Sequence, residues 1–467
     1  MAKKIAPDEA ENNKAKSAED LAEVSNVESI EDLINISEVG DSSAVAAGRG
    51  AKAIVINFFG GKWQPILLLF AVILVTGGYF LRTELYPEKM TGDFRVAVAD
   101  FAIVGNPGQA DAGTELAEGV YLKLNESLSE INKDFIITIW PPDKVGKIKG
   151  NTPEERAESA EKIAQKIGAD ILIYGFIDMS KPVWQVTPEF YVTSENFYEA
   201  EEITGQYQMG ESFTLVGQEN VARRIELSNK YETRSQAIAR ITIGLAYFSL
   251  RDYQNAFAVF QEAENISGWD ETQGKAVLYL LAGNAAMKAN DFEMAESSLN
   301  KSLAIDPEYG RPLITLGSVY YLQALEPFEQ SKNPASIDLD LIDKAIEMYN
   351  QALVAKNQPA LSDISSKVHF GLGQCYFMQS YAGMDTPLVN AINEFKIVID
   401  DYGDGKNPRI REITAESHAR LGLIYYFSDH PQDAVQEYQL AADLLYDYPE
   451  RQALYQKRAD EILQSIP

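Results

Sequence analysis

The pattern of hydrophobic and polar positions changes most sharply at residues 63–81, nineteen consecutive residues without a charged side chain. A helix of this length measures roughly 28 Å, close to the hydrocarbon thickness of a bilayer. Trp63 and Tyr79 lie near its two ends, where amphipathic rings favour the headgroup level. A buried core helix is the alternative, but such a helix usually carries a polar stripe on one face, and this stretch has none. The pattern predicts a transmembrane helix at residues 63–82.

Residues 1–62, before this stretch, are expected to form an acidic and mostly disordered tail. The first fifty residues carry eleven acidic side chains against five basic ones. Such a composition cannot bury enough apolar surface to offset the entropy lost on ordering. Within the tail, residues 21–36 place apolar side chains at helical spacing. This stretch is either a transient helix or a docking motif for a cytosolic partner.

The charges around the predicted span do not decide its orientation. Within about fifteen residues of the span, three basic residues precede it and three follow it. A cleaved signal peptide is not expected, because the apolar stretch begins late and follows an acidic tail. We expect a single-pass membrane protein with its N-terminal tail in the cytoplasm and its C-terminal body outside the cytoplasm.

Residues 93–218 alternate between strand and helix patterns. Three apolar runs rich in β-forming residues predict strands at residues 94–101, 135–140 and 169–178. Helical spacing predicts helices at residues 114–128 and 153–167. The second helix is expected to begin after Thr152, a capping residue, and to end at Gly168. This alternation predicts an α/β domain with a mainly parallel sheet and flanking helices.

The motifs of this region also carry a family resemblance. Their order, VAVADF, GTELAEGVYLKLNESL, FIITIW and EKIAQKIGADILIYGFID, resembles the TolB N-terminal type of domain and the related CsgG-like group. The likeness covers residues 93–180. The segment after Asp178 departs from the family pattern, since it is longer and rich in aromatic and acidic residues. The resemblance implies a non-catalytic, protein-binding domain of the cell envelope.

From residue 220 onward the pattern becomes helical and repeats. Each copy has a Gly, an Ala twelve positions later and a large apolar residue sixteen positions later, although the third and fourth copies reach the latter two sixteen and six residues late. The copies begin at Gly244, Gly283, Gly317, Gly373 and Gly422. This pattern resembles the 34-residue tetratricopeptide repeat, so residues 220–467 are expected to form an all-α solenoid of about five repeats. A capping helix after Pro449 is expected to pack through Leu454, Ile462 and Ile466.

Aligning the copies identifies a candidate groove for a protein partner on the first helix of each repeat. Few of these positions are basic, so a clamp for a peptide carboxylate is not expected. Their aromatic and apolar character suits an amphipathic helix or an extended apolar peptide. The alternative is that these side chains pack against the preceding domain. The candidate residues are Leu245, Phe248, Asn284, Met287, Lys288, Ser318, Tyr321, Gln374, Phe377, Leu423 and Tyr426.

Composition narrows the function further. The formal net charge of −28 disfavours binding to nucleic acid, which needs concentrated Lys and Arg. The single cysteine, Cys375, excludes an intrachain disulfide and paired-cysteine metal or redox motifs. With only three histidines in the chain, we expect no metal, no cofactor, no catalytic residue and no enzymatic activity.

Three features have residue types that could carry chemistry, and each is interpreted as structural. His369 and His418 each lie four residues before a repeat Gly, but without an acidic partner they would make a poor metal site, so a packing role is expected. Residues 105–108 follow the first strand but lack the GxGxxG spacing and the Walker lysine of a nucleotide loop, which leaves a turn. Three aspartates at strand ends are expected to be solvated caps: Asp100, Asp170 and Asp178.

Together these patterns predict a membrane-anchored adaptor in envelope assembly or trafficking, which binds a partner peptide or helix through the repeat groove. The rival hypothesis is an envelope sensor, in which the α/β domain binds a small ligand or glycan and the repeats signal to a partner.

Overall fold

The computed structural model of the chain divides into two units, Met1–Pro87 and Glu88–Pro467. It describes residues 44–45, 54–55, 88–105, 111–131, 135–180, 183–197, 200–215, 221–267, 269, 272–355, 362–384, 387–403 and 408–466. The described residues of the first unit are two short strands, β1 (Ala44–Val45) and β2 (Ile54–Val55), which pair antiparallel. The predicted transmembrane helix and the predicted docking stretch, residues 63–82 and 21–36, lie outside the described residues. Within the described ranges, no helix is long and apolar enough to cross a membrane.

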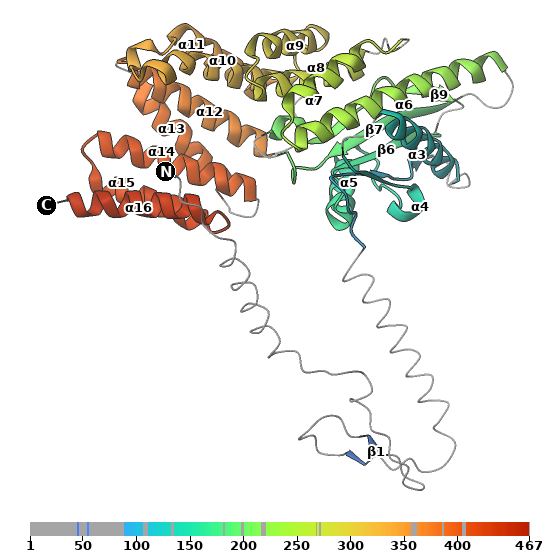
Figure 1. The fold of residues 1–467 in the computed structure, drawn as a ribbon, viewed down its shortest axis with the longest axis horizontal. Coiled ribbons are helices and arrows are strands. Elements are labelled where there is room, and N and C mark those ends of the chain that lie inside the picture. The colour runs from blue at the N-terminus through green and yellow to red at the C-terminus, as the bar shows by residue number, and fades with distance from the viewer. Residues whose placement is uncertain are drawn as a thin grey trace, which may run out of the picture. The chain divides into compact units, whose positions relative to one another are not determined.

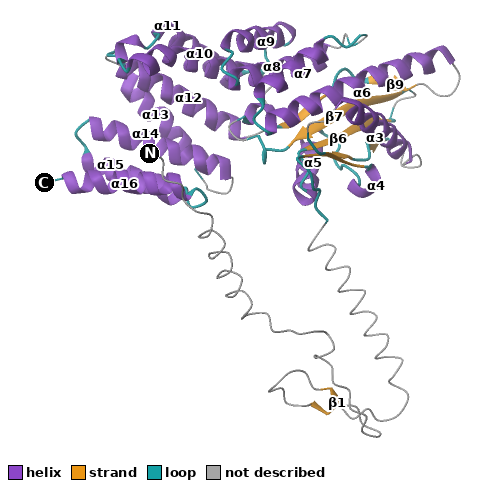
Figure 2. Ribbon diagram, viewed as in Figure 1, coloured by secondary structure: helices purple, strands orange, loops and turns teal. Residues whose placement is uncertain are grey.

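The second unit begins with a sheet, whose strands are orange in Figure 2. The strand order is β5-β3-β6-β7-β8, with β4 also beside β6 and β9 beside β7. Its strands are β3 (Phe94–Val98), β4 (Ala102–Val104), β5 (Ile137–Trp140), β6 (Ile171–Asp178), β7 (Trp184–Val192), β8 (Gly205–Gln208) and β9 (Phe213–Leu215). The three strands predicted from the sequence, β3, β5 and β6, pair parallel as expected, and β4, which was not predicted, also pairs parallel with β6.

The second half of the sheet is antiparallel, so the prediction of a mainly parallel sheet is wrong. β7 pairs with the whole length of β6, from Ile171 opposite Val192 to Asp178 opposite Gln185. Only five residues separate the two strands. A parallel crossover needs a dozen or more residues, so this short connection requires an antiparallel return. The result is a mixed sheet.

Helices cover both faces of the sheet (Figure 1). They are α3 (Asp111–Ile131), the short α4 (Pro142–Val145) and α5 (Pro153–Ile167). Val120 and Leu124 of α3 share a core with Val96 on one face, whereas Ala160 of α5 packs with Leu172 on the other. The predicted bounds of α5 are confirmed. Thr152 and the side chain of the N3 glutamate form a capping box at its start, and Gly168 ends it in the left-handed conformation.

In the part of the chain that the structure describes, five helical hairpins and one further helix follow the sheet, and Figure 1 shows their succession. The hairpins are α6 (Val221–Ser249) with α7 (Tyr253–Glu264), α8 (Thr272–Lys288) with α9 (Phe292–Ile305), α10 (Gly310–Ser331) with α11 (Leu339–Val354), α12 (Ser362–Tyr381) with α13 (Pro387–Tyr402), and α14 (Pro408–Phe427) with α15 (Pro431–Leu444). The last helix is α16 (Pro449–Ser465). The insertion in the third copy lengthens α10 and adds the 3₁₀ turn η4 (Pro334–Ser336).

The repeat positions pack as the spacing predicts. A Cβ on Gly283 would lie 2.5 Å from Cγ of Leu299, and a Cβ on Gly373 would lie 2.7 Å from the ring of Phe395. Glycine is therefore needed for close approach of the paired helices. The same relationship joins Gly317 to Tyr349 across the longest insertion. The alanines of all five copies are fully buried: Ala256, Ala295, Ala345, Ala391 and Ala434.

The capping helix α16 departs from prediction at one residue. Ile462 is buried and Ile466 packs against the same cluster, as expected. Leu454 is 52% exposed, so its predicted packing role is wrong. The side chains that share the buried face with Ile462 are Tyr455 and Ala459 instead, three or four residues apart as helical geometry requires.

One hydrophobic core joins the sheet to the first repeats. An aromatic chain runs from Phe94 in β3 to Phe197, then to Phe248 in α6 and Tyr253 in α7, with centroid distances of 6.4, 6.1 and 5.0 Å. Phe135 also meets Tyr247 edge to face at 5.0 Å. Contacts between aromatic rings stabilise such a junction by more than the burial of apolar area alone would. The α/β region and the solenoid are thus parts of one compact unit.

Candidate functional site

A short acidic turn from the α/β region enters the solenoid. This turn, η3 (Glu201–Ile203), lies between β7 and β8, and its two carboxylates are 4% and 0% exposed. Lys367 of α12 donates to Glu201 at 2.8 Å and to Glu202 at 2.6 Å. Arg409 of α14 also pairs with Glu201. Two buried carboxylates are thereby held by cations from the fourth and fifth repeats.

The ion pairs offset the cost of burial. Burial raises the pKa of Glu201, but the charges of Lys367 and Arg409 outweigh it and lower that pKa to about 2. Burial lowers the pKa of Lys367, and the two glutamates reverse this and raise it. Glu201 and Lys367 are therefore both charged at neutral pH, as a stable buried ion pair requires.

A third cation fixes the neighbouring backbone. Arg311 of α10 is 3% exposed and donates to the carbonyls of Glu202 at 3.4 Å and Gln206 at 3.3 Å. Its guanidinium also lies 4.2 Å from the ring centroid of Tyr207. Since Arg311 and Lys367 both lie six residues before a repeat Gly, one repeat position supplies two cations for the acidic turn.

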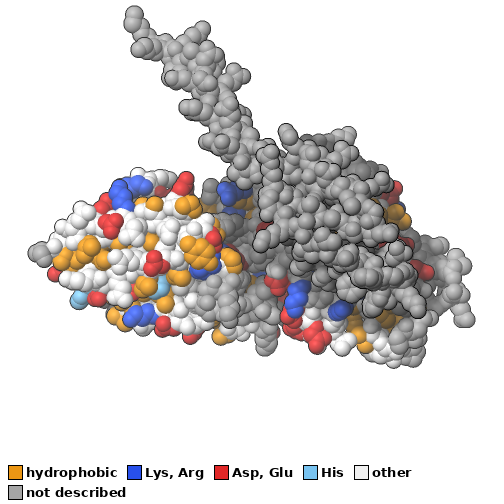
Figure 3. Space-filling model, turned by 90° about the horizontal axis from the view of Figure 1, so that it is seen from below, with side chains coloured by type: hydrophobic (Ala, Val, Ile, Leu, Met, Phe, Trp, Pro, Cys, Tyr) orange, Lys and Arg blue, Asp and Glu red, His pale blue; other side chains and the backbone are white. Residues whose placement is uncertain are grey.

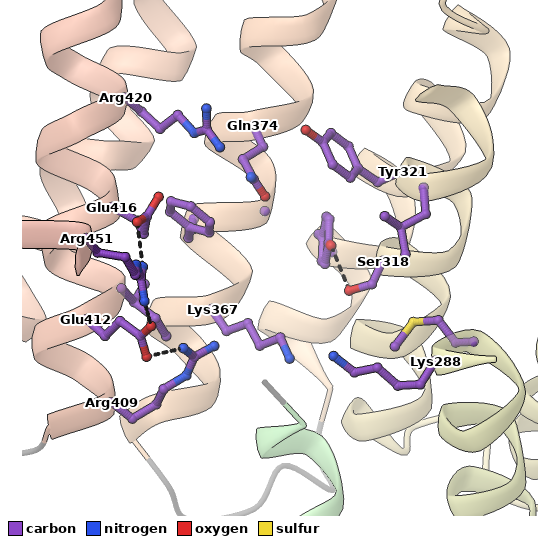
Figure 4. A pocket seen from close by; sticks show the side chains of 16 residues that line it. Lys288, Ser318, Tyr321, Lys367, Gln374, Arg409, Glu412, Glu416, Arg420 and Arg451 are labelled. Carbon is purple, nitrogen blue, oxygen red and sulfur yellow. Dashed lines mark hydrogen bonds and ion pairs between the residues drawn. The ribbon is translucent and has the colours of Figure 1, made fainter. Parts of the chain in front are cut away.

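Above this turn lies a cavity of about 620 Å³, which we name the solenoid cavity (Figure 4). It is lined mainly by the first helices of repeats two to five and by α16. Its volume falls in the range of small-molecule pockets. The basic lining residues outnumber the two acidic ones, Glu412 and Glu416. They are Lys288, Lys367, Arg409, Arg420 and Arg451.

Aromatic and apolar side chains form the rest of the wall. Tyr349 is buried, and its hydroxyl lies 3.1 Å from the hydroxyl of Ser318. A Cβ on Gly371 would come within 2.6 Å of the Tyr349 ring, so glycine admits this ring to the wall. Tyr321 and Phe370 add further aromatic surface. The cavity thus combines positive charge with flat apolar contacts.

Most of the cations are already held in place. Arg409 pairs with Glu412 at 2.6 Å, and Arg451 pairs with Glu412 and, at 2.6 Å, with Glu416. Arg420 differs, because its Nε is buried without a hydrogen-bond partner. Figure 4 shows its guanidinium pointing into the cavity beside the amide of Gln374.

The eleven groove residues predicted from the repeats lie in three places. Those that line the solenoid cavity are Met287, Lys288, Ser318, Tyr321 and Gln374. Those that are buried are Leu245, Phe248, Asn284 and Phe377. Leu423 and Tyr426 line a separate cavity of about 310 Å³ near α16.

The buried set has structural partners. Phe248 contacts the α/β region through Phe197, and Asn284 donates to the hydroxyl of Thr315 at 3.1 Å. Sequence reasoning found Lys288 but missed the other four cations of the cavity, which are Lys367, Arg409, Arg420 and Arg451. A charge at the repeat position shared by Arg311 and Lys367 was the available signal.

The histidines and aspartates have local partners. His369 lies 2.7 Å from Glu394, and His418 lies 2.6 Å from Glu437, so the expectation that these histidines lack an acidic partner is wrong. Each pair bridges the two helices of its own repeat, and no group of three or more metal-ligating side chains occurs among the described residues. Asp170 is fully buried and binds Arg95 at 2.7 Å, and Asp100 is 7% exposed, so the expectation of a solvated cap is wrong for both.

Comparison with known proteins supports the repeat assignment. The tetratricopeptide repeat family model matches residues 237–268 and 276–309. No curated protein matches the sequence. The resemblance of residues 93–180 to the TolB type stays a prediction, because the family match lies within the repeats.

The chain is also similar, at low identity, to solved structures, two of which are described as tetratricopeptide repeat proteins. A thermophilic protein from Thermus thermophilus is 18% identical, with a TM-score of 0.33, and covers 48% of this chain and 98% of that one. YrrB, described as having an unusual peptide-binding site, is 19% identical, with a TM-score of 0.30. The match covers 51% of this chain and 98% of YrrB. PilF of Pseudomonas aeruginosa is 17% identical, with a TM-score of 0.30. The match covers 47% of this chain and 88% of PilF.

Proposed function

We propose that this protein is a non-enzymatic adaptor whose solenoid cavity binds a peptide segment of a partner protein. A tetratricopeptide-like repeat fold indicates a role in protein–protein interaction. The observation that carries the proposal is the position of the solenoid cavity. It opens on the first helices of four successive repeats, where charged and aromatic side chains converge.

Site-specific photo-crosslinking tests this function. A photoreactive phenylalanine analogue at Leu322, which is 40% exposed at the cavity, should give discrete adducts with partner proteins. The matched control is the same analogue at Leu440 of α15, which is 38% exposed and does not line the cavity. Identical adducts from both positions, or none from either, would contradict the proposal. Turnover of a substrate by the purified protein would contradict the non-enzymatic part.

The proposal also places this adaptor at a membrane, with a role in envelope assembly or trafficking. Its support is the uncharged stretch at residues 63–81, which is long enough to span a bilayer. Deleting residues 63–82 should release the protein from membranes washed at alkaline pH. Protease added to intact cells should cleave the C-terminal body and spare the tail. Cleavage of the tail before the C-terminal body would indicate the opposite orientation.

A sensor is the second candidate, and one cavity favours it. This cavity of about 440 Å³ is lined by Tyr191, Thr193 and Ser194 of the α/β region and by Pro408 and Tyr448 of the solenoid. A small polar ligand bound there would contact both regions. A rise in melting temperature with a sugar or metabolite pool, in the absence of any protein partner, would favour the sensor over the adaptor.

A further inference from the structure

We infer that the solenoid cavity takes an acidic peptide segment with an adjacent aromatic or apolar side chain, and that Arg420 binds its carboxylate. This inference rests on the proposed function and names the chemistry of the partner. It changes the expectation from sequence, which favoured an apolar peptide or helix.

The chain itself shows what this part of the solenoid binds. The acidic turn is an internal ligand, because Glu201 and Glu202 reach across from the α/β region to Lys367 and Arg409. Both cations also line the solenoid cavity. One end of the cavity is therefore built around two carboxylates of an acidic, partly apolar sequence, AEEI at residues 200–203. A partner segment of the same character would continue along the remaining wall.

Charge supports the same occupant. The lining has five basic residues against two acidic ones. When Glu201 and Glu202 are counted as well, the basic groups still exceed the acidic ones by one, in a chain whose net charge is −28. A positive site within a negative protein concentrates anions locally and excludes basic segments.

Arg420 is the group that is left for a partner. Salt bridges hold Lys367, Arg409 and Arg451. The Nε of Arg420 is buried and makes no hydrogen bond, which is costly unless a ligand satisfies it. A guanidinium presents a planar fork that matches a carboxylate in bidentate geometry. Figure 4 shows that Gln374 lies beside it, where its amide can contact the same group.

The apolar part of the cavity lining sets a second requirement for the bound segment. Tyr321, Phe370 and Met287 face the same cavity. Aromatic rings provide large contact areas at low entropic cost, so a Phe or Leu next to the acidic residue would complete the fit. A purely acidic segment would leave these surfaces exposed to water.

Two pools of short fluorescent peptides test the inference on the full chain in detergent micelles. One pool is built from Asp, Glu, Phe and Leu, and the other from Asn, Gln, Phe and Leu. Fluorescence polarisation should show about tenfold tighter binding of the acidic pool, and this preference should fall as salt is raised. Arg420→Gln should remove most of the preference. Lys457→Gln on the exposed face of α16 makes the same charge change and should leave it intact.

The outcomes separate this inference from the proposed function. Equal binding of both pools, or an unchanged preference in Arg420→Gln with a wild-type melting temperature, would overturn the inference. If Arg420→Gln does not fold, Gln374→Leu provides the second test, since it should weaken the acidic pool alone. If neither pool binds while Leu322 still gives discrete adducts, the acidic-segment inference fails and the adaptor function stands. If the adducts are also absent, both fail.

Discussion

Lys367 of the fourth repeat donates to Glu202 of the α/β region at 2.6 Å, although 165 residues separate them in the chain. The same ammonium also binds Glu201 at 2.8 Å, so one cation holds both carboxylates of the acidic turn. This relationship couples the sheet to the far half of the solenoid. Lys367 also lines one end of the solenoid cavity, so the shape of the binding site depends on the contact between Lys367 and the acidic turn.

Removing the ammonium group of Lys367 should destabilise the whole second unit. Lys367→Met leaves two buried carboxylates with less compensation, and breaking a buried pair in this way typically costs about 3–5 kcal/mol. We expect a lower urea midpoint that affects the sheet and the repeats together. Lys123→Met is the matched control, because Lys123 pairs with Glu126 at 3.2 Å on the surface, where such a pair contributes about 1 kcal/mol or less. Equal midpoints for the two variants would contradict this role of Lys367.

Low pH should weaken the contact between the acidic turn and the solenoid. The pKa of Glu201 is lowered to about 2, below the ordinary value of 4.5. A carboxylate with a lowered pKa contributes stability that is fully present above its unfolded pKa and is lost as pH falls through its folded pKa. The urea midpoint should therefore drop between about pH 4.5 and pH 2. Glu201→Gln should reduce the steepness of this drop, and an unchanged profile would show that another group controls it.

The repeat geometry was predictable from the sequence because it is set by short-range spacing. The pairing of Gly317 with Tyr349 follows from a fixed offset plus one insertion, and α5 follows from the cap at Thr152 and the stop at Gly168. Such signals lie within one hairpin or one helix, so a single sequence contains them.

The cavity was only partly predictable, because its chemistry comes from distant segments. Tyr321 and Gln374 followed from the repeat alignment, but nothing near Lys367 in the sequence indicates that the acidic turn will reach it. The antiparallel return of β7 was missed for a different reason. Its direction depends on the short connection after Asp178, whereas the apolar run alone does not specify direction.

The repeat glycines offer a graded test of close packing. A Cβ at Gly283 would lie 2.5 Å from Leu299, whereas at Gly422 its nearest neighbour would be 3.0 Å away, on Tyr438. Gly283→Ala should therefore cost about 1–3 kcal/mol through overpacking, partly offset by the better helix propensity of Ala. Gly422→Ala should cost less. Thermal unfolding of the two variants measures the difference, and the reverse order would contradict the packing account.

The groove residues predicted from sequence should separate into two classes by mutation. Leu245 is fully buried, so Leu245→Ala should lower the free energy of unfolding by about 2–5 kcal/mol and leave peptide affinity unchanged where the protein is folded. Gln374 lines the solenoid cavity, and Gln374→Ala should weaken binding of the acidic peptide pool with little effect on stability. Calorimetric melting and fluorescence polarisation on the same samples measure both quantities.

A matched pair extends this test to the second cavity. Tyr426 is 48% exposed and lines the cavity near α16, outside the solenoid cavity. Tyr426→Ala should therefore leave both the acidic-pool affinity and the melting temperature close to those of the wild type. Since Tyr426 and Gln374 were both predicted as groove residues, equal losses of affinity in the two variants would mean that the partner segment extends beyond the solenoid cavity. A loss confined to Gln374→Ala would place the binding site on the wall shared with Arg420. Figure 3 shows that hydrophobic side chains are scattered among charged ones on the face it presents, so exposure alone does not mark a binding surface there.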